Sequence, residues 1–468
     1  MKRSLPEIQG VRSRSTGQWS RREAFAALSF GGGLAAFGGL GPLLRLANAA
    51  GPETAASDRY FLFCYFNGGW DVLLGLDPRD PDVFTADVRA DTRIEPGYDT
   101  LQDVGKVPLT LSSGVTVGPY FGRLADYADQ VAIVRGMSME TLTHEAGRRR
   151  FITGKPPSGL LARGSSIASY LAANLGSDHP IPNIAMNHEA YNPDLPAFAT
   201  ALQVASTDDL VRALSPGEYD LDPALRARTE ELLEQIRTCD ANQTSLARSD
   251  ALDFRLSARE LVEQGLDALF DFGSSSPEMV ALRARYGIST SNLKSNAAAS
   301  AMAVTALTAG ISRCASITVA SGLDTHYSDW QRNQGPNQQA GFDLVAAIAD
   351  DLASRDYNGT GTSWLDHTVI VGFSEFSRTS LLNDAGGRDH ALTNACFLLG
   401  GGIRGGRVLG ASSDVGLEPQ AIDLATGALD PAGEIPKPEH VLRALMTEVG
   451  IDTDDADLRV DPLAALFG

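Results

Sequence analysis

The stretch from 364 to 406 (WLDHTVIVGFSEFSRTSLLNDAGGRDHALTNACFLLGGGIRGG) constrains the fold more than any other part of this sequence. It opens with an apolar run at 367–373 that is rich in Val, Ile and Thr and too short for a helix, which predicts a buried strand. Polar residues follow at once, and a Gly-rich turn then leads to a second apolar run at 394–399. Since ligand sites in open α/β sheets form at the carboxyl ends of strands, this pattern predicts a site there.

Further short apolar runs predict the other strands of a sheet, at 59–67, 130–136, 182–186, 314–321 and 407–410. Helical patterns lie between them, with apolar residues at i, i+3 and i+4. These predicted helices span 143–154, 223–238, 250–270, 277–286, 292–309, 342–354 and 438–449. We therefore expect an α/β fold whose central sheet is mostly parallel and flanked by helices, with a mainly helical insertion at about 206–309.

The N-terminal 49 residues have the pattern of a twin-arginine signal peptide. Arg21 and Arg22 precede an apolar, Gly- and Ala-rich segment, and Ala47-Asn48-Ala49 supplies small residues for cleavage. The alternative is an uncleaved N-terminal membrane anchor. We expect the twin-arginine export machinery as a partner and a periplasmic or secreted location. The rest of the chain, 58–468, is expected to be a single domain with no membrane span.

The 468-residue chain is acidic, with a formal net charge of −19 at pH 7. The first 49 residues carry seven Lys or Arg and two Asp or Glu, so the remainder carries −24. Such a charge disfavours nucleic acid and anionic membranes and is compatible with bound divalent cations. Four cysteines in a chain of this length do not indicate a disulfide framework.

Acidic residues and histidines gather where predicted strands end. Together they are Asp71, His144, Asp324, His326, Glu375, Asp389 and His390. Carboxylate oxygens and neutral imidazoles are ligands of divalent metals, so the sequence predicts one or two bound ions (Zn, Mg, Ca or Mn). The alternative is a buried hydrogen-bond network without metal.

The segment 137–154 (MSMETLTHEAGRRRFITG) predicts a helix whose N-terminus faces this edge of the sheet. Thr141 and Thr143 are N-cap residues, and Gly154 ends the helix. Because a helix N-terminus attracts anions, Thr143, His144 and one of the three arginines at 148–150 are candidates for contact with an anionic ligand.

Seven motifs in this order resemble the Tat-exported family known as domain of unknown function 1501, within the alkaline phosphatase and sulfatase superfamily. The motifs are SRREAF, FNGGWD, THEAGRRRFITG, SGLDTH, SEFSRT, GRDH and GGGIRGG. The resemblance spans nearly the whole chain after the signal peptide. It implies an alkaline-phosphatase-like fold.

The same resemblance implies roles for individual residues. His144 falls where sulfatases place their nucleophile, with Arg148 at the arginine position and Thr143 as the nearest hydroxyl. Asp71 resembles the first metal ligand, Asp324 and His326 a later pair, and Asp389-His390 the last ligand segment; Glu375 stands where an Asp-His pair is expected. The motif departs from sulfatases in having His144 in place of Cys or Ser and Ala146 in place of Pro.

Two functional hypotheses follow. In the first, the protein is a metal-dependent hydrolase of small phosphate or sulfate esters. The metal ligands would be Asp71, Asp324, His326, Glu375, Asp389 and His390. Thr143 would attack with His144 as base, or His144 would attack directly, and Arg148 or Arg378 would stabilise developing charge. In the second, the protein is a non-catalytic exported binding protein that keeps the fold. A surface-layer protein is not favoured, because the sequence is neither repetitive nor β-rich.

Overall fold

The computed structural model describes residues 58–156, 158–159, 161–215, 222–238, 262, 264–451 and 456–467. The predicted signal peptide, most of the predicted helix at 250–270, and Cys239 lie outside these residues. The other three cysteines are buried free thiols, as expected from a chain without a disulfide framework. The domain boundary near residue 58 stays a prediction.

An eight-stranded mixed sheet forms the centre of the described structure, in the order β12-β4-β11-β8-β1-β7-β5-β6. Its strands are β1 (Tyr60–Phe66), β4 (Ala132–Ser138), β5 (Asn183–Met186), β6 (Leu202–Val204), β7 (Cys314–Ala320), β8 (Thr368–Ser374), β11 (Thr393–Gly400) and β12 (Arg407–Leu409). Only β11 among these runs antiparallel to its neighbours. The expected α/β fold with a mostly parallel sheet is therefore confirmed.

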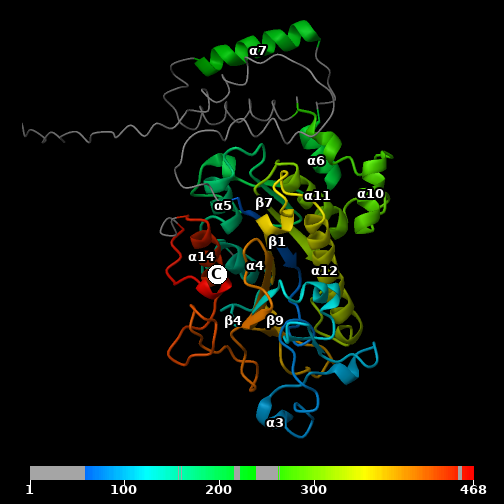
Figure 1. Cartoon of the computed structure of the whole chain (residues 1–468), viewed down its shortest axis with the longest axis vertical. Coiled ribbons are helices and arrows are strands. Elements are labelled where there is room, and N and C mark those ends of the chain that lie inside the picture. Colours follow the sequence, from blue (N-terminus) through cyan, green and yellow to red (C-terminus); the bar gives the residue numbers. More distant parts are fainter. Residues whose placement is uncertain are drawn as a thin grey trace, which may run out of the picture. The chain divides into compact units, whose positions relative to one another are not determined.

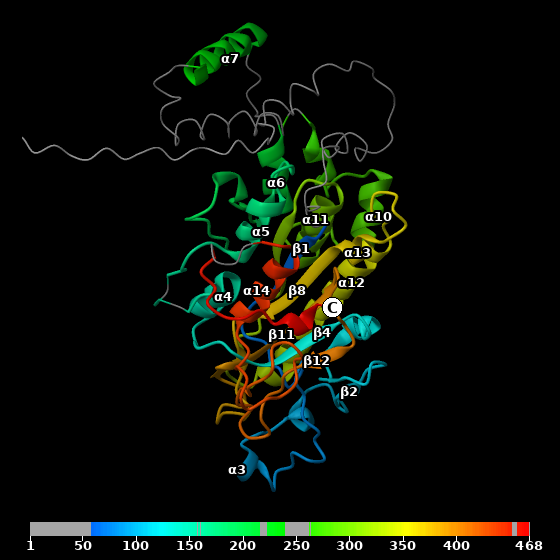
Figure 2. The ribbon, with the colours of Figure 1, turned by 60° about the vertical axis from the view of Figure 1, so that its left-hand side comes forward.

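Helices cover both faces of the sheet (Figures 1 and 2). One face packs against α11 (Asn296–Thr308) and α12 (Trp330–Ala353), and the other against α4 (His144–Thr153), α5 (Ile167–Leu175) and α14 (Pro438–Glu448). Strand β1 shows why both layers are needed. Leu62, Cys64 and Phe66 face the first layer, while Phe61, Phe63 and Tyr65 face the second.

The remaining described elements lie around this core. The insertion contains α6 (Thr207–Leu214), α7 (Pro223–Thr238), η5 (Leu266–Leu269) and α10 (Pro277–Tyr286), and is mainly helical where it is described. Short elements occur elsewhere: α3 (Arg89–Thr92), η2 (Tyr98–Thr100), β2 (Leu109–Thr110), β3 (Thr116–Val117), η3 (Gly122–Tyr127), η4 (Ala197–Ala199), α13 (Trp364–His367), β9 (Ser377–Arg378), β10 (His390–Ala391) and η6 (Ala464–Leu466).

The structure contains α5 and β6, for which the sequence predicted no element, and it also differs from the prediction in α12. This helix begins at Trp330, twelve residues before the predicted start at 342, and contains Pro336. Its first half carries few apolar residues, so periodicity gave no signal. The buried Gln334 and Gln338 in that half instead form hydrogen bonds with the turn that follows β1. A smaller difference concerns His367, which ends α13 rather than beginning the strand.

Candidate metal centre

The parallel strands β1, β7 and β8 end at the same edge of the sheet, and the site forms in the loops beyond them. Strand β1 leads into Gly68-Gly69, where tight backbone packing requires glycine. Gly68 has φ +116°, and a Cβ there would lie 2.7 Å from the backbone nitrogen of Asp324. Gly147 in α4 likewise packs against the backbone of Glu375. These close approaches bring β1, β7, β8 and α4 together around one point.

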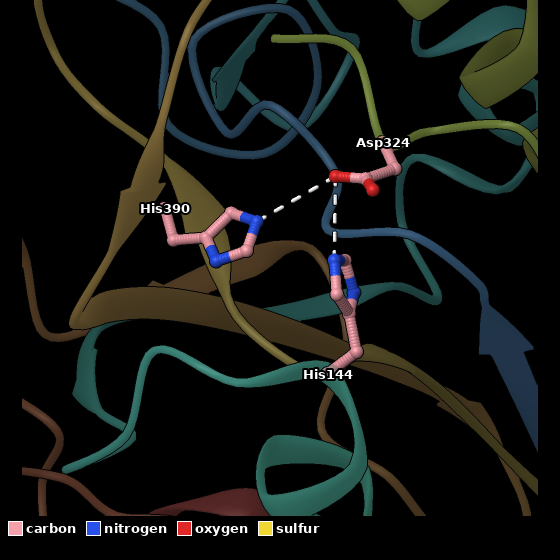
Figure 3. A group of neighbouring side chains, drawn as sticks. All are labelled: His144, Asp324 and His390. Atoms are coloured by element: carbon pink, nitrogen blue, oxygen red, sulfur yellow. Dashed lines mark ion pairs between the residues drawn. The ribbon is translucent and has the colours of Figure 1, made fainter.

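Three histidines point their Nε2 atoms at one carboxylate oxygen, Oδ1 of Asp324. The distances from this oxygen are 3.3 Å to His144, 3.0 Å to His326 and 3.5 Å to His390. Figure 3 shows His144 and His390, which come from α4 and β10, on two sides of Asp324, which follows β7. His144, Asp324 and His390 offer ligand atoms that all lie within 4.8 Å of one another.

The opposite nitrogen of each of these imidazoles is held by an acceptor. Nδ1 of His144 donates to Glu375 (2.7 Å), and Nδ1 of His326 donates to Asp389 (2.9 Å). Nδ1 of His390 donates to the backbone carbonyl of Leu142 at 2.6 Å. Such partners fix the tautomer of metal-binding histidines, because the proton on Nδ1 leaves the Nε2 lone pair free for the metal. The arrangement therefore has the outer shell of a metal centre as well as its candidate ligands.

The geometry and the charge of this group both fit a divalent cation. Ligands about 2.0–2.2 Å from a tetrahedral ion lie roughly 3.4 Å apart, close to the 3.0–3.5 Å separations from Asp324 Oδ1. With neutral imidazoles, the carboxylates of Asp324, Glu375 and Asp389 and the guanidinium of Arg378 leave a formal charge of −2. Nε2 of His326 also lies 3.0 Å from Nε2 of His390, so a proton or a cation is needed between them.

The pKa values in the cluster follow from burial and these neighbours. Burial would raise the pKa of Asp324, but the hydrogen bond from Arg378 and the nearby charges lower it to about 2. Burial also lowers the pKa of His390, and the positive charge of Arg378 lowers it further. For His144, burial lowers the pKa, but Glu375 and Asp324 together outweigh it and raise the pKa overall. Asp324 is thus an anion across the physiological range.

Arg378 is a buried support of the site rather than an open anion-binding group. Its guanidinium donates to Asp324 (2.7 Å), to His326 (3.3 Å) and to four backbone carbonyls. Those carbonyls belong to Gly68, Gly69, Leu323 and Arg388. Because its donors are all engaged, the predicted role of Arg378 in stabilising charge on a substrate is not supported by these contacts.

Asp71, which the sequence grouped with these ligands, has other partners. Its carboxylate is fully buried and pairs with Arg388 at 3.1 Å, while accepting hydrogen bonds from the indole of Trp330 and the backbone of Leu73. The backbone of Asp71 is held on both sides by Gln338. These contacts give Asp71 a structural role as half of a buried ion pair, and we remove it from the candidate ligands.

Glu375 and Asp389 lie behind histidines rather than beside the point of convergence. The buried carboxylate of Glu375 accepts from His144, from the backbone of Gly68 (2.9 Å) and from Ser374 (2.8 Å). Asp389 accepts from His326 and Asn383. The structure therefore brings both residues to the predicted site but places them as supports of ligands.

The structure does not bring together the predicted nucleophile and base. Thr143 is the exposed N-cap of α4, and its hydroxyl lies 3.5 Å from that of Thr141 rather than against His144. Both ring nitrogens of His144 are already engaged, with Glu375 and Asp324. Arg148 lies one helical turn further along α4 and pairs with Glu189. The geometry thus gives His144 the position of a ligand.

Several residues of this site were absent from the sequence prediction. Arg388, Trp330 and Gln338 hold Asp71, and the carbonyl of Leu142 holds His390. Arg388 stands directly before Asp389-His390, so its position in the motif GRDH was the one available signal. The sequence carries no comparable signal for the backbone carbonyl of Leu142, or for Trp330 and Gln338 in the polar first half of α12.

Similar solved structures share little sequence with this chain. A protein in the alkaline phosphatase superfamily from Vibrio parahaemolyticus is 10% identical, with a TM-score of 0.35 over 89% of this chain and 71% of that one. Ps i-CgsB, solved in complex with k-i-k-neocarrahexaose, is 9% identical, with a TM-score of 0.36 over 86% and 74%. At this level of similarity, the ligands of those proteins carry no information about this one.

No curated protein sequence matches this chain significantly. A family profile, described as a protein of unknown function (DUF1501), matches residues 62–429. The matched region begins within β1, ends beyond β12, and contains every residue of the candidate metal centre. Because the match covers most of the sequence, the chain belongs to the DUF1501 family.

Proposed function

We propose that this protein is a metal-dependent hydrolase of small phosphate or sulfate esters. One observation supports the proposal above the others: the Nε2 atoms of three imidazoles, each held through Nδ1, surround one oxygen of Asp324. A divalent ion at this point would polarise an ester oxygen and activate water as a nucleophile.

The chain's own residues would hold and orient the reactants. Asp324, His144 and His390 are the proposed ligands, because their ligand atoms all lie within 4.8 Å of one another, whereas Nε2 of His326 already accepts a hydrogen bond from Arg378. Glu375 and Asp389 would keep His144 and His326 in the correct tautomer. The N-terminus of α4 begins at His144, so its backbone N–H groups and helix dipole would attract the anionic oxygens of the ester. Thr143 is not needed as a nucleophile in this proposal.

The second candidate is a non-catalytic binding protein, and Arg378 favours it. The guanidinium already lies 2.7 Å from the Asp324 oxygen and 3.3 Å from His326 Nε2. In this alternative, Arg378 and a protonated His144 supply the positive charge, and the cluster is a hydrogen-bond network without metal. The raised pKa of His144, due to Glu375 and Asp324 despite burial, is compatible with it.

Export by the twin-arginine route, and hence a periplasmic or secreted location, is part of the proposal. It rests on the sequence of the first 49 residues alone. Within the described residues, no helix combines the length and hydrophobicity needed to span a bilayer.

The test is hydrolysis of 4-nitrophenyl phosphate and 4-nitrophenyl sulfate by protein loaded with Zn²⁺, Mn²⁺, Mg²⁺ or Ca²⁺. We expect turnover that a chelator abolishes and that Asp324→Asn lowers at least 100-fold. Asp384→Asn is the matched control, because Asp384 is an exposed aspartate in the Gly-rich segment between β9 and β10. Turnover that survives both the chelator and Asp324→Asn would contradict the proposed mechanism. Absence of both turnover and bound metal would favour the binding protein.

A further inference from the structure

A polar cavity of about 230 Å³ lies beside the candidate metal centre and has no role in the proposed chemistry so far. It opens beyond the carboxyl ends of β1 and β5. The residues that line it are Tyr65, Asn67, Arg148, Asn187, His188 and Glu189. Ligand pockets for whole drug-sized molecules start at about 300 Å³, so this cavity suits one part of a ligand.

Two connections place this cavity next to the metal cluster. Arg148 follows His144 by four residues on α4, so the two side chains leave the same face of the helix. Tyr65, on the other wall, lies close to Glu375. Burial raises the pKa of Tyr65, and the negative charge of Glu375 raises it further. Asn67 directly precedes Gly68, whose backbone donates to Glu375. A ligand held at the cluster would therefore extend into this cavity.

His188 is the most unusual residue of the cavity. The residue is only 8% exposed, and its two ring nitrogens are buried without a hydrogen-bond partner. The ring packs against Tyr65, with centroids 5.2 Å apart, and against Phe373 at 5.8 Å. A buried polar group without a hydrogen-bond partner destabilises a fold. A ligand that supplies the missing partner would account for this one.

The cavity offers neutral partners that both donate and accept. Burial, with the charge of Arg148, lowers the pKa of His188 to about 3, so the imidazole is neutral and presents one donor and one acceptor. The amide of Asn187 adds a donor and an acceptor, and that of Asn67 adds its NH₂ donor, since its oxygen already accepts from the Tyr65 hydroxyl at 3.2 Å. The guanidinium of Arg148 is paired with Glu189, which also binds Arg149 and Tyr191. The two guanidiniums share the single carboxylate of Glu189, which leaves a formal charge of +1 on this wall, so an anion is the competing ligand that the test must exclude.

We propose that this cavity is the subsite for a neutral, hydroxyl-bearing alcohol portion of the substrate, with His188 as a binding residue. Hydroxyl groups both donate and accept hydrogen bonds, as the neutral imidazole and the two amides require. The inference rests on the proposed function for its place in catalysis, since the cluster would hold the ester group while this cavity holds the alcohol. Binding itself does not require turnover.

The test is ligand-observed NMR binding of methyl β-D-glucopyranoside, a neutral polyhydroxyl probe, to the full protein. We expect His188→Phe to weaken binding at least tenfold while thermal stability is kept or increased, because Phe preserves the ring packing and removes the unpaired nitrogens. His367→Phe is the matched control. His367 stacks on Tyr357 and directly precedes β8, whereas the site lies beyond the carboxyl end of that strand. Its replacement should therefore leave binding unchanged.

Asn67→Ala provides a second variant, because Asn67 is exposed and its side chain contributes one hydrogen bond to the fold, accepted from the Tyr65 hydroxyl at 3.2 Å. It should also weaken probe binding. Repeating the titration with Asp324→Asn separates the two proposals: binding that persists there supports the subsite even if no metal-dependent hydrolysis exists. Unchanged binding in both His188→Phe and Asn67→Ala would overturn the inference. Displacement of the probe by inorganic sulfate in Asp324→Asn would also overturn it, since the cavity would then be an anion site.

Discussion

Two aspartates follow neighbouring parallel strands of this sheet, yet the fold uses them differently. Asp71, after β1, is fully buried and pairs with the equally buried Arg388. The side chain of Asp324, after β7, is 51% exposed and is surrounded by three imidazoles as well as Arg378. Both aspartates pair with a buried arginine, so an acid at a strand end is a candidate ligand only when its carboxylate also remains accessible and faces other ligand atoms.

The largest effect should come from breaking the buried pair. Arg388→Met leaves the Asp71 carboxylate buried without its partner, so we expect a loss of about 3–5 kcal/mol in the free energy of unfolding. Urea denaturation measures this loss. The double variant Asp71→Leu/Arg388→Met should recover much of the stability, because no buried charge remains unpaired. Equal losses in the single and double variants would show that the pair does not act as a unit.

A smaller change in stability, but a large change in metal affinity, is expected from Glu375→Gln. The amide can no longer accept from His144 Nδ1 as a charged carboxylate does, so the tautomer and orientation of this ligand are less well fixed. We expect metal affinity to fall about 10–100-fold, measured by competition with a chromophoric chelator. Glu418→Gln, in a loop outside the site, is the control. Unchanged affinity in Glu375→Gln would remove Glu375 from the centre.

His188 gives a prediction for the pH dependence of stability. Burial lowers its pKa in the folded protein to about 3, while the unfolded chain titrates near 6.5. The unfolded state therefore binds more protons as the pH falls below 6.5, and folded stability is lost in that direction. Between pH 7 and 5 this residue should account for about 2 kcal/mol. The difference in unfolding free energy between the wild type and His188→Phe should grow by that amount, and a pH-independent difference would contradict it.

The smallest effect is expected from Thr143→Ala. Thr143 makes no side-chain cap hydrogen bond in α4, so the change in stability should be within about 0.5 kcal/mol. Hydrolysis, where it is measured, should be retained within a few-fold. Loss of turnover with unchanged metal content would instead restore Thr143 as the nucleophile and show that α4 moves on substrate binding.

Much of the fold was predictable because its core strands are short, apolar runs with distinct ends. The helix α4 and its Gly154 terminus were also predictable, since the threonines and the glycine occupy the expected capping positions. The start of α12 was not, because its buried glutamines act through hydrogen bonds that leave no periodic pattern.

The sequence predicted which acids and histidines gather at this edge of the sheet, but not which of them face the centre and which support or lie apart from it. It grouped Asp71 with Asp324 because both follow strands, and only the position of Arg388 separates them. It also placed Glu375 among the ligands, although the carboxylate lies behind His144. These distinctions depend on side-chain directions across segments more than 200 residues apart in the sequence, which spacing cannot show.

The most direct test of the central claim is the metal content of the folded protein, measured by elemental analysis for the wild type, Asp71→Asn and Asp324→Asn. We expect about one equivalent of a divalent metal in the wild type and in the folded fraction of Asp71→Asn, and its loss in Asp324→Asn. A wild-type protein that contains no metal and cannot be loaded would contradict it, as would a metal that is lost in Asp71→Asn but kept in Asp324→Asn.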